Sequence, residues 1–357
     1  MDEEVPVSRM PTDGPPEAVH APLLLFYSEL VQECGGKPDG LLVRAGMEPD
    51  GLASGLATYR QVAELLEITA ASLGRPDFGM MLGLRQCREG IEGPLGQVMR
   101  HASRFGETLE LAVRHGYAHS LASRTWLHRT ASGRSILFGH DIVLEGLVST
   151  RQVMEQILLF GHLTAIRLTG GAVRARRILL RHGCLSPTPV YRRYFGCDVR
   201  FDQRINATVY HEADMACPIL SADLPAYIGE LAAIEQRFAE KRPPLSRIVR
   251  GAILHALEDE DCTGERIAAQ LGLHIRNLHR HLQREGTSFR LIKDNVRRDL
   301  ARYYLRDTDL DMKTISERLG FSEQSALSRR AGKWFGGSPS AIRAGKRTGT
   351  GGREMSD

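Results

Sequence analysis

The sequence predicts an α+β N-terminal domain followed by an all-α C-terminal domain built from two similar halves. Three observations carry this prediction. After residue 124 the apolar residues change from a helical spacing to a strand-like alternation. The tandem prolines of "KRPPLS" (Lys241–Ser246) then interrupt the chain, because they cannot continue a helix. Beyond them the helical spacing resumes, repeats itself, and ends near Arg343.

The N-terminal domain begins with helices and continues with strands. Residues 1–18 are polar and proline-rich, which predicts a disordered tail, and the spacing from Pro22 to Gly83 is helical. From Arg124, two apolar runs around a Gly-containing turn predict a β-hairpin. A helix near Thr150–Leu168 and strands in "ARRILLRH", "CDVRF" and "NATVYH" follow. We therefore predict one α+β domain over residues 19–220.

A linker is predicted over residues 221–245. Its helix, Leu224–Glu240, has an apolar stripe that could pack on a neighbouring domain or on a second subunit: Ile228, Leu231, Ile234 and Phe238. The all-α domain then covers residues 246–345, and residues 346–357 are a second disordered tail.

Charge is divided unevenly between the two parts of the chain. From Lys241 to the end there are 23 Lys and Arg against 15 Asp and Glu, or +8, so the first 240 residues carry −4 of the total of +4. A basic C-terminal part favours a polyanionic partner. The six cysteines are far apart with no CxxC spacing, and the longest early apolar run, "APLLLFY", is too short to cross a membrane. We expect reduced thiols, no secretory signal, no membrane partner and a cytoplasmic location.

The C-terminal domain contains an internal repeat. Ile267–Gly272 is matched by Ile315–Gly320, and Leu278–Arg280 by Leu327–Arg329. Each copy reads as a helix, a Gly-containing turn and a second helix, so we predict two helix-turn-helix motifs. The helix of nearly twenty residues between them, "FRLIKDNVRRDLARYYLRD", would hold the two motifs apart.

The second helix of each motif has one polar face that suits DNA. In the first copy, Leu278 and Leu282 should point to the core, and the opposite stripe is Arg276, His279, Arg280 and Gln283. In the second copy, Leu327 and Ala331 point inward, and the outward polar residues are Gln324, Ser325, Ser328 and Arg329. Arg can bind guanine through two hydrogen bonds and Gln can bind adenine, and the major groove is wide enough for such a helix. A solvated basic face is the alternative for any single residue.

A metal site is the other way to interpret the histidines of the first copy. His274, His279 and His281 are spaced five and two apart, so no two of them share a helix face at i and i+4. We therefore expect no metal and no cofactor.

Ile267 to Arg343 closely resembles the AraC/XylS family of bacterial transcription regulators, through "LHRHLQREGTSFRLIKDNVRRDLARYYL" and "ISERLGFSEQSALSRRAGKWFGGSP". The resemblance implies base-facing positions at Arg276, His279 and Arg280 and at Gln324, Ser325 and Arg329. Ala331 and Gly332 depart from the aromatic and basic residues that are usual in the family. Since an interior Gly costs a helix roughly 1 kcal/mol against Ala, the second reading helix should be less rigid.

The N-terminal part resembles the effector-binding domain of the ornithine- and virulence-regulator branch, through "PDFGMMLGLR", "YRRYFGCDVRF" and "INATVYHEADMACPILSAD". That resemblance implies a small-molecule sensor for amino acids, fatty acids or other organic acids. Arg192 and Arg193 could pair with a carboxylate ligand, and Trp126 and Phe138 could line its pocket. Packing against neighbouring elements is the alternative for each of them.

Two other classes of protein fit the sequence less well than a regulator. A catalytic domain based on cysteine would need a cysteine cluster or a strand–Cys–helix elbow; Cys217 in "MACPIL" and Cys184 in "RHGCLSPTP" have neither, so we expect no enzyme. A non-specific architectural DNA-binding protein would not need a 200-residue sensor. We therefore expect a sequence-specific transcription regulator, an activator, controlled by a small-molecule effector such as an organic acid or amino acid. Its expected partners are double-stranded DNA, RNA polymerase and a second copy of itself, and the Leu224–Glu240 helix and "KRPPLS" would connect the effector to DNA binding.

Overall fold

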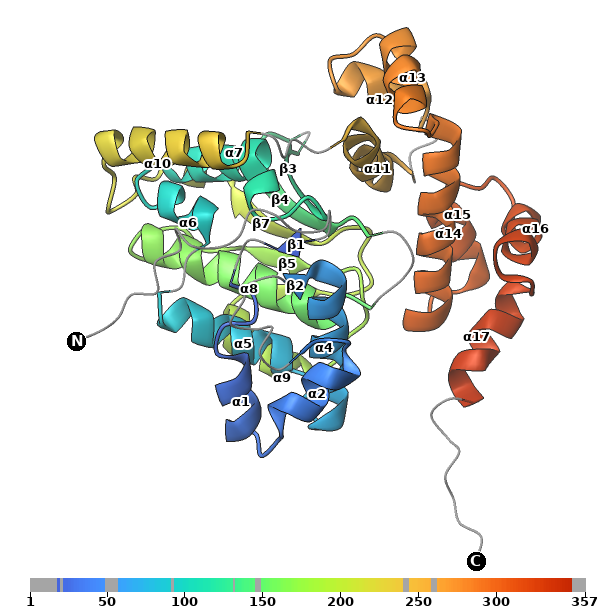
Figure 1. Ribbon diagram of the computed structural model, residues 1–357, viewed down its shortest axis with the longest axis horizontal. Coiled ribbons are helices and arrows are strands. Elements are labelled where there is room, and N and C mark those ends of the chain that lie inside the picture. Colours follow the sequence, from blue (N-terminus) through green and yellow to red (C-terminus); the bar gives the residue numbers. More distant parts are fainter. Residues whose placement is uncertain are drawn as a thin grey trace, which may run out of the picture. The chain divides into compact units, whose positions relative to one another are not determined.

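The structure is a computed structural model that describes residues 18–19, 22–48, 57–90, 93–130, 132–144, 149–239, 244–257 and 262–348. The described residues up to 239 form one compact unit, and those from 244 onward form another. Figure 1 shows both units, with colours that follow the sequence from blue at the N-terminus to red at the C-terminus. Most of the two predicted tails (residues 1–17 and 349–357) and residues 240–243 of the predicted linker lie outside the described residues.

The first unit combines helices with a five-stranded sheet, which confirms the predicted α+β class. Its helices are α1 (Tyr27–Glu33), α2 (Pro38–Arg44), α4 (Tyr59–Ser72), α5 (Phe78–Arg88), α6 (Pro94–Met99), α7 (Phe105–His115), α8 (Arg151–Leu168), α9 (Thr188–Phe195) and α10 (Leu224–Arg237), with the short 3-10 helices η2 (Gly116–Ala118) and η3 (Glu212–Ala216). Its strands are β1 (Ala18–Val19), β2 (Ala57–Thr58), β3 (Ser123–Arg129), β4 (Ser135–Ile142), β5 (Arg177–Leu179), β6 (Asp198–Arg200) and β7 (Ala207–His211).

The large sheet has the order β3-β4-β7-β5-β6, and all its neighbouring strands are antiparallel except β5 and β6. The predicted hairpin is β3–β4. Its register places Leu127 opposite Phe138 and Trp126 opposite Gly139. Because side chains alternate between the faces of a strand, Phe138 and Trp126 lie on opposite faces of the sheet.

Helix α8 is the central helix of the first unit, and α5 lies directly against it (Figure 1). The close approach depends on two glycines one turn apart. A Cβ on Gly79 would overlap the carbonyl oxygen of Gln152, and one on Gly83 would lie 2.7 Å from that of Gln156. The Gly79 N–H donates to Gln152 Oε1 at 2.8 Å, so the same close contact is also hydrogen-bonded.

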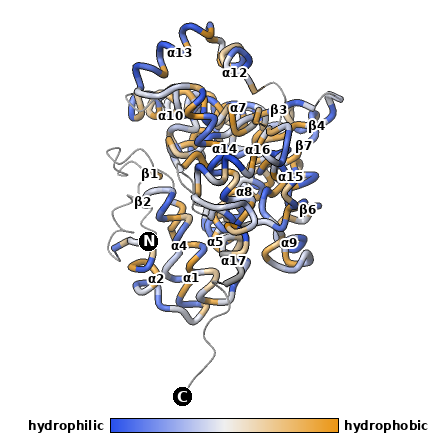
Figure 2. Tube along the Cα trace, turned by 90° about the vertical axis from the view of Figure 1, so that its right-hand side faces the viewer, coloured by the Kyte–Doolittle hydropathy of each residue, from blue (hydrophilic) through white to orange (hydrophobic). Residues whose placement is uncertain are grey.

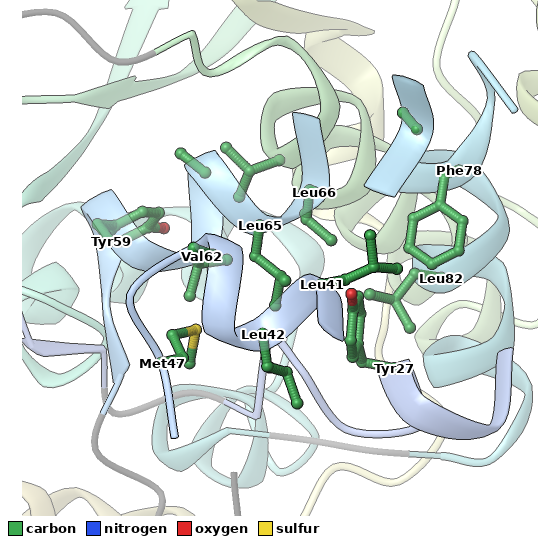
Figure 3. Close-up of a cluster of buried hydrophobic side chains, with 14 of the residues drawn as sticks. Tyr27, Leu41, Leu42, Met47, Tyr59, Val62, Leu65, Leu66, Phe78 and Leu82 are labelled. Carbon is green, nitrogen blue, oxygen red and sulfur yellow. The ribbon is translucent and has the colours of Figure 1, made fainter. Parts of the chain in front are cut away.

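Apolar side chains fill the spaces between these elements. One cluster joins α1, α2, α4 and α5 around Tyr27, Leu42 and Leu65 (Figure 3). A second lies between α8, α9 and the sheet and includes Leu159 and Ile178. Burial of these side chains supplies most of the driving force for folding the unit.

Helix α10 packs within the first unit, against α6. Tyr227, Ile234 and Phe238 are buried there, whereas Ile228 is 58% exposed. Ile228 therefore departs from the predicted apolar stripe. Its neighbour Tyr227 takes the buried position instead, and consecutive residues of a helix lie about 100° apart around the helix axis.

The second unit is all-helical, as predicted. Its helices are α11 (Leu245–Ala256), α12 (Gly264–Gln270), α13 (Ile275–Arg284), α14 (Phe289–Asp307), α15 (Met312–Arg318), α16 (Gln324–Phe335) and α17 (Pro339–Thr348). One apolar cluster runs through the whole unit. It takes Leu278 and Leu282 from α13, Val296 from α14 and Leu327 from α16. Both halves of the repeat therefore share a single core.

Candidate nucleic-acid interface and ligand cavity

The first helix-turn-helix motif consists of α12, a turn and α13. The turn passes through Gly272, whose φ of 67° is left-handed and favours glycine. The side chain of His274 caps α13, because its Nδ1 accepts a hydrogen bond from the Arg276 N–H at 3.2 Å. His274 thus has a structural role at the start of the helix, and among the described residues no cluster of His, Cys, Asp or Glu could hold a metal ion.

The faces of α13 separate apolar from polar side chains. Leu278 and Leu282 are fully buried. The predicted DNA-facing residues Arg276, His279, Arg280 and Gln283 are all exposed. Figure 2 shows α13 coloured mainly as hydrophilic. The helix thus presents two guanidinium groups, an imidazole and an amide to solvent along one side.

The second motif repeats this arrangement in α15, a turn at Gly320 and α16. Leu327 and Ala331 are fully buried. The predicted DNA-facing residues Gln324, Ser325, Ser328 and Arg329 are all exposed. Arg329 Nη1 donates to Ser325 Oγ at 3.3 Å, which orients the guanidinium along the helix. Gly332 is exposed too, and a Cβ there would meet nothing within 4 Å.

Helix α14 holds both motifs through side chains that the sequence pattern did not single out. Arg297 donates to the carbonyl oxygens of Leu319 (2.9 Å) and Gly320 (2.7 Å) in the second turn. Lys293 donates to the carbonyl oxygen of Cys262, just before α12, at 2.5 Å. These contacts attach each motif to one rod, so the spacing of α13 and α16 is set by α14. Only the apolar seam of this helix was visible as a pattern in the sequence.

The first unit contains a cavity of about 220 Å³ between the sheet and helices α6, α7 and α8. One face of the sheet lines it, through residues such as Phe138, Thr208 and Tyr210. Most of its remaining wall is apolar: Leu95, Met99, Leu109, Leu158, Phe160 and Leu168. Among the described residues that line it there is no Lys, Arg, Asp or Glu.

A few polar groups interrupt this apolar wall. The hydroxyl of Tyr59 lies 2.5 Å from His119 Nε2 and 3.4 Å from His140 Nε2, and both histidines line the cavity. Burial lowers the pKa of His140 to about 4, so its imidazole is neutral at pH 7. Gln156 and Gln86 form a second polar group on the wall, joined by a 2.9 Å hydrogen bond.

The residues predicted to bind an effector lie away from this cavity. Arg192 and Arg193 are exposed on α9. Trp126 packs over Gly139 on the face of the sheet opposite to Phe138, and only Phe138 lines the cavity. The sequence reasoning missed His140 and Gln156. The alternation of "SILFGHDI" places His140 on the Phe138 face, whereas nothing in the helical pattern distinguished Gln156.

A buried polar cluster lies beneath α9. Tyr191, next to the exposed arginines, donates to Glu155 Oε1 at 2.5 Å, and His182 Nε2 lies 3.6 Å from the same oxygen. Burial raises the pKa of Glu155 to about 8, against the opposite effect of the Tyr191 hydrogen bond. Burial also lowers the pKa of His182 to about 4, so this is a neutral pair at pH 7.

Comparisons with known proteins agree with both units. Residues 35–219 match the arabinose-binding N-terminal domain of AraC transcription regulators, and residues 267–345 match a helix-turn-helix domain. The HTH-type transcriptional regulator VirS of Mycobacterium tuberculosis is 32% identical over 330 residues, covering 91% of this chain and 96% of VirS. The ornithine utilization regulator of Pseudomonas aeruginosa is 26% identical, covering 88% of this chain and 93% of that protein.

A third relative matches a shorter part of the chain. The transcriptional activator NphR of a Rhodococcus species is 38% identical over 99 residues, which are 28% of this chain and 29% of NphR. The resemblance seen in the repeat and in the N-terminal motifs is therefore confirmed along nearly the whole length: the chain belongs to the AraC family of transcription regulators, with a DNA-binding helix-turn-helix domain and an effector domain.

Proposed function

We propose that this regulator reads its DNA site with α13 and α16 together, and that a small molecule in the cavity of the first unit controls the reading. The observation that carries the first part is the pair of exposed polar faces, each backed by fully buried leucines. Arg276 and Arg280 suit guanine, and Gln324 suits adenine.

The length of α14 supports simultaneous reading. Its 19 residues extend about 28 Å. Major-groove segments on one face of B-DNA recur about every 34 Å, and Arg297 and Lys293 attach both motifs to this helix. One chain would then occupy two successive turns of DNA.

Methylation interference tests the DNA part. The full chain is bound to a duplex selected from a random library, after partial methylation of guanine N7. We expect two clusters of interfering guanines, about 10 base pairs apart. A single cluster, on a duplex that has guanines in both half-sites, would contradict simultaneous reading by the two helices.

The cavity is our candidate for the effector site because the sheet and three helices line it and it has few, well-placed polar groups, as ligand sites do. We propose that ligand binding there is coupled to DNA binding through α10 and the segment that follows it. Because coupling is reciprocal, effector affinity should rise when operator DNA is present. Equal affinity with and without DNA would contradict the coupling.

Two protein partners belong to the same proposal. The name of NphR states that this relative is a transcriptional activator. We propose that this protein likewise activates transcription, by acting on RNA polymerase. It would also form a homodimer through an exposed apolar strip that includes Leu220 (73% exposed), Leu224 (68%) and Ile228 (58%). Sedimentation of an Ile228→Asp variant tests the dimer: it should be monomeric where the parent protein is dimeric.

We propose no catalytic activity, and two of the thiols are poorly suited to act as nucleophiles. Burial raises the pKa of Cys184, and it raises that of Cys197 to about 11, so both are protonated at pH 7. None of the described helices is long and apolar enough to span a membrane. Since chromosomal DNA is its target, we propose that the protein acts in the cytoplasm.

A further inference from the structure

The cavity runs along one side of helix α8, and its shape and chemistry restrict what it can hold. Gln156, Phe160, Thr164 and Leu168 all line it, each four residues from the next. The twelve steps along the helix from Gln156 to Leu168 span roughly 18 Å at 1.5 Å per residue. A volume of about 220 Å³ drawn out along a helix suits a narrow, extended molecule rather than a compact ring system or a sugar.

The charge of the lining disfavours an ionised ligand. The described lining has no Lys, Arg, Asp or Glu; of its two histidines, His140 is neutral at pH 7 and His119 is hydrogen-bonded to the Tyr59 hydroxyl. A carboxylate moved from water into an apolar space without a cation loses its hydration and gains no partner. The arginines of α9 lie outside the cavity lining, so they cannot supply that cation.

Gln156 supplies a single directional polar group. Gln86 Nε2 donates to the carbonyl oxygens of Pro22, Leu23 and Leu25, which fixes the orientation of that amide. Its Oε1 therefore accepts from Gln156 Nε2 at 2.9 Å, and Gln156 Nε2 also donates to Leu23 O at 2.7 Å. The nitrogen and oxygen of Gln156 are thus assigned by their partners.

The remaining atom of this amide, Gln156 Oε1, is a buried acceptor without a hydrogen-bond donor within the described part of the chain. Gln156 itself is fully buried and lines the cavity. A buried acceptor left unpaired destabilises a protein, so a ligand that donates to it binds more tightly than one that cannot. Thr164 Oγ1, two turns along α8, also lacks a partner there, but a hydroxyl can donate or accept and so selects no particular group.

We infer that the effector is an uncharged, extended, mostly aliphatic molecule with a hydrogen-bond donor, such as a hydroxyl or primary amide, placed against Gln156 Oε1. This inference rests on the proposal that the cavity is the effector site, and it names the class of ligand for that site. It differs from the organic acid or amino acid that the resemblance of the N-terminal part implied, and whose carboxylate Arg192 and Arg193 could have bound.

The test compares three probes of the same chain length on the full-length protein by isothermal titration calorimetry at pH 8. The probes are 1-decanol, its methyl ether, which lacks the donor, and decanoate, which is charged. We expect 1-decanol to bind about tenfold more tightly than the ether, which cannot donate to Gln156. We expect decanoate to bind at least about a hundredfold more weakly than 1-decanol.

A blocking variant locates the binding. Ala165 is buried and lines the cavity from α8, so Ala165→Leu should fill the space and abolish binding of 1-decanol. The same change at Ala71, exposed on α4 and outside the cavity lining, should leave the affinity unchanged. Circular dichroism and thermal unfolding of each variant establish that it is folded.

The outcomes separate the two proposals. Binding of 1-decanol that survives Ala165→Leu would overturn the cavity as the effector site. If decanoate or the ether binds with the same affinity as 1-decanol, and Ala165→Leu abolishes that binding, the cavity remains the effector site but the proposed class of ligand is overturned. Failure of all three probes to bind the parent protein would also overturn the class.

Discussion

A Cβ atom on Gly320 would overlap the backbone carbonyl oxygen of Leu257. Gly320 lies in the turn of the second helix-turn-helix motif, and Leu257 ends α11 in the first half of the domain. Its φ of 64° independently favours glycine, and its own carbonyl accepts a hydrogen bond from Arg297. The turn of one motif is thus packed against the backbone of the other half, which makes the two halves a single folded unit.

Gly320→Ala should therefore destabilise the DNA-binding domain by about 2–4 kcal/mol. The new methyl group would overlap the carbonyl oxygen of Leu257, and alanine is strained at a left-handed φ. Urea unfolding followed by circular dichroism measures the free energy of unfolding. Gly332→Ala is the matched control: that glycine is exposed within α16, and the new methyl group would meet nothing within 4 Å. It should stabilise the domain by about 1 kcal/mol. Equal effects of the two changes would contradict the proposed packing.

Arg280→Ala tests the reading face of α13. If Arg280 makes a bidentate contact with guanine, its loss should weaken specific binding by about 1–3 kcal/mol and relax the preference at one base pair. Binding to a randomised duplex library, followed by sequencing, measures both effects. Arg306→Ala removes the same charge at an exposed position on α14 and should leave base preference unchanged. If the Arg280→Ala variant has the same base preference as the parent protein, Arg280 is not one of the residues that contact bases.

Gly79→Ala tests the close approach of α5 and α8. The added methyl group would overlap the carbonyl oxygen of Gln152, so the helices would have to separate. We expect a loss of about 1–3 kcal/mol in the free energy of unfolding. Gly161→Ala on α8 has nothing within 4 Å of the added methyl and should instead be neutral or stabilising by roughly 0.5–1 kcal/mol. Thermal unfolding of the two variants side by side distinguishes these outcomes.

Buried Glu155 should make stability depend on pH. Its pKa is raised by burial to about 8, whereas an ordinary glutamate in the unfolded chain titrates near 4.3. Between these values the unfolded state loses the proton and the folded state keeps it, so the free energy of unfolding falls as pH rises. The stabilisation is fully present below the unfolded pKa and is lost as pH rises through the folded pKa.

Glu155→Gln should flatten this dependence. The window to measure is pH 6.5–8, because the buried histidines with lowered pKa values, His140, His162 and His182, raise stability with pH only below about 6.5. There the parent protein should lose up to about 1.4 kcal/mol per pH unit relative to Glu155→Gln. Glu110→Gln, the same change at an exposed site, serves as control. Parallel curves for parent and Glu155→Gln would show that Glu155 is ionised throughout.

Much of the fold could be read from local patterns. The β3–β4 hairpin, α8 and the repeated helices follow from short-range periodicity and glycine positions, which depend on neighbouring residues. The burial of Leu278, Leu282 and Leu327 follows from helical spacing alone. Prediction was weaker where two adjacent residues were both apolar and either could have been the buried one. On α10 the buried residue is Tyr227 and the exposed one is Ile228.

The cavity that we propose as the ligand site could not be predicted in this way. Arg192 and Arg193 were predicted to bind a carboxylate ligand because they are charged and adjacent. Both are exposed on α9, and neither lines the cavity. Trp126 and Phe138 are both aromatic hairpin residues, but the register of β3 with β4 places them on opposite faces. The polar atom that we propose to restrict the ligand belongs to Gln156, and its orientation depends on backbone carbonyls more than a hundred residues away.

The sequence by itself determined the family, the two classes of domain and the polar faces of the reading helices, because motifs and periodicities are properties of contiguous residues. The tertiary structure alone decided which side chains enclose the cavity, which oxygen within it lacks a donor, and how Gly320 is seated against Leu257. Such relationships depend on distances between segments far apart in the chain, and those distances exist only once the helices and the sheet have packed.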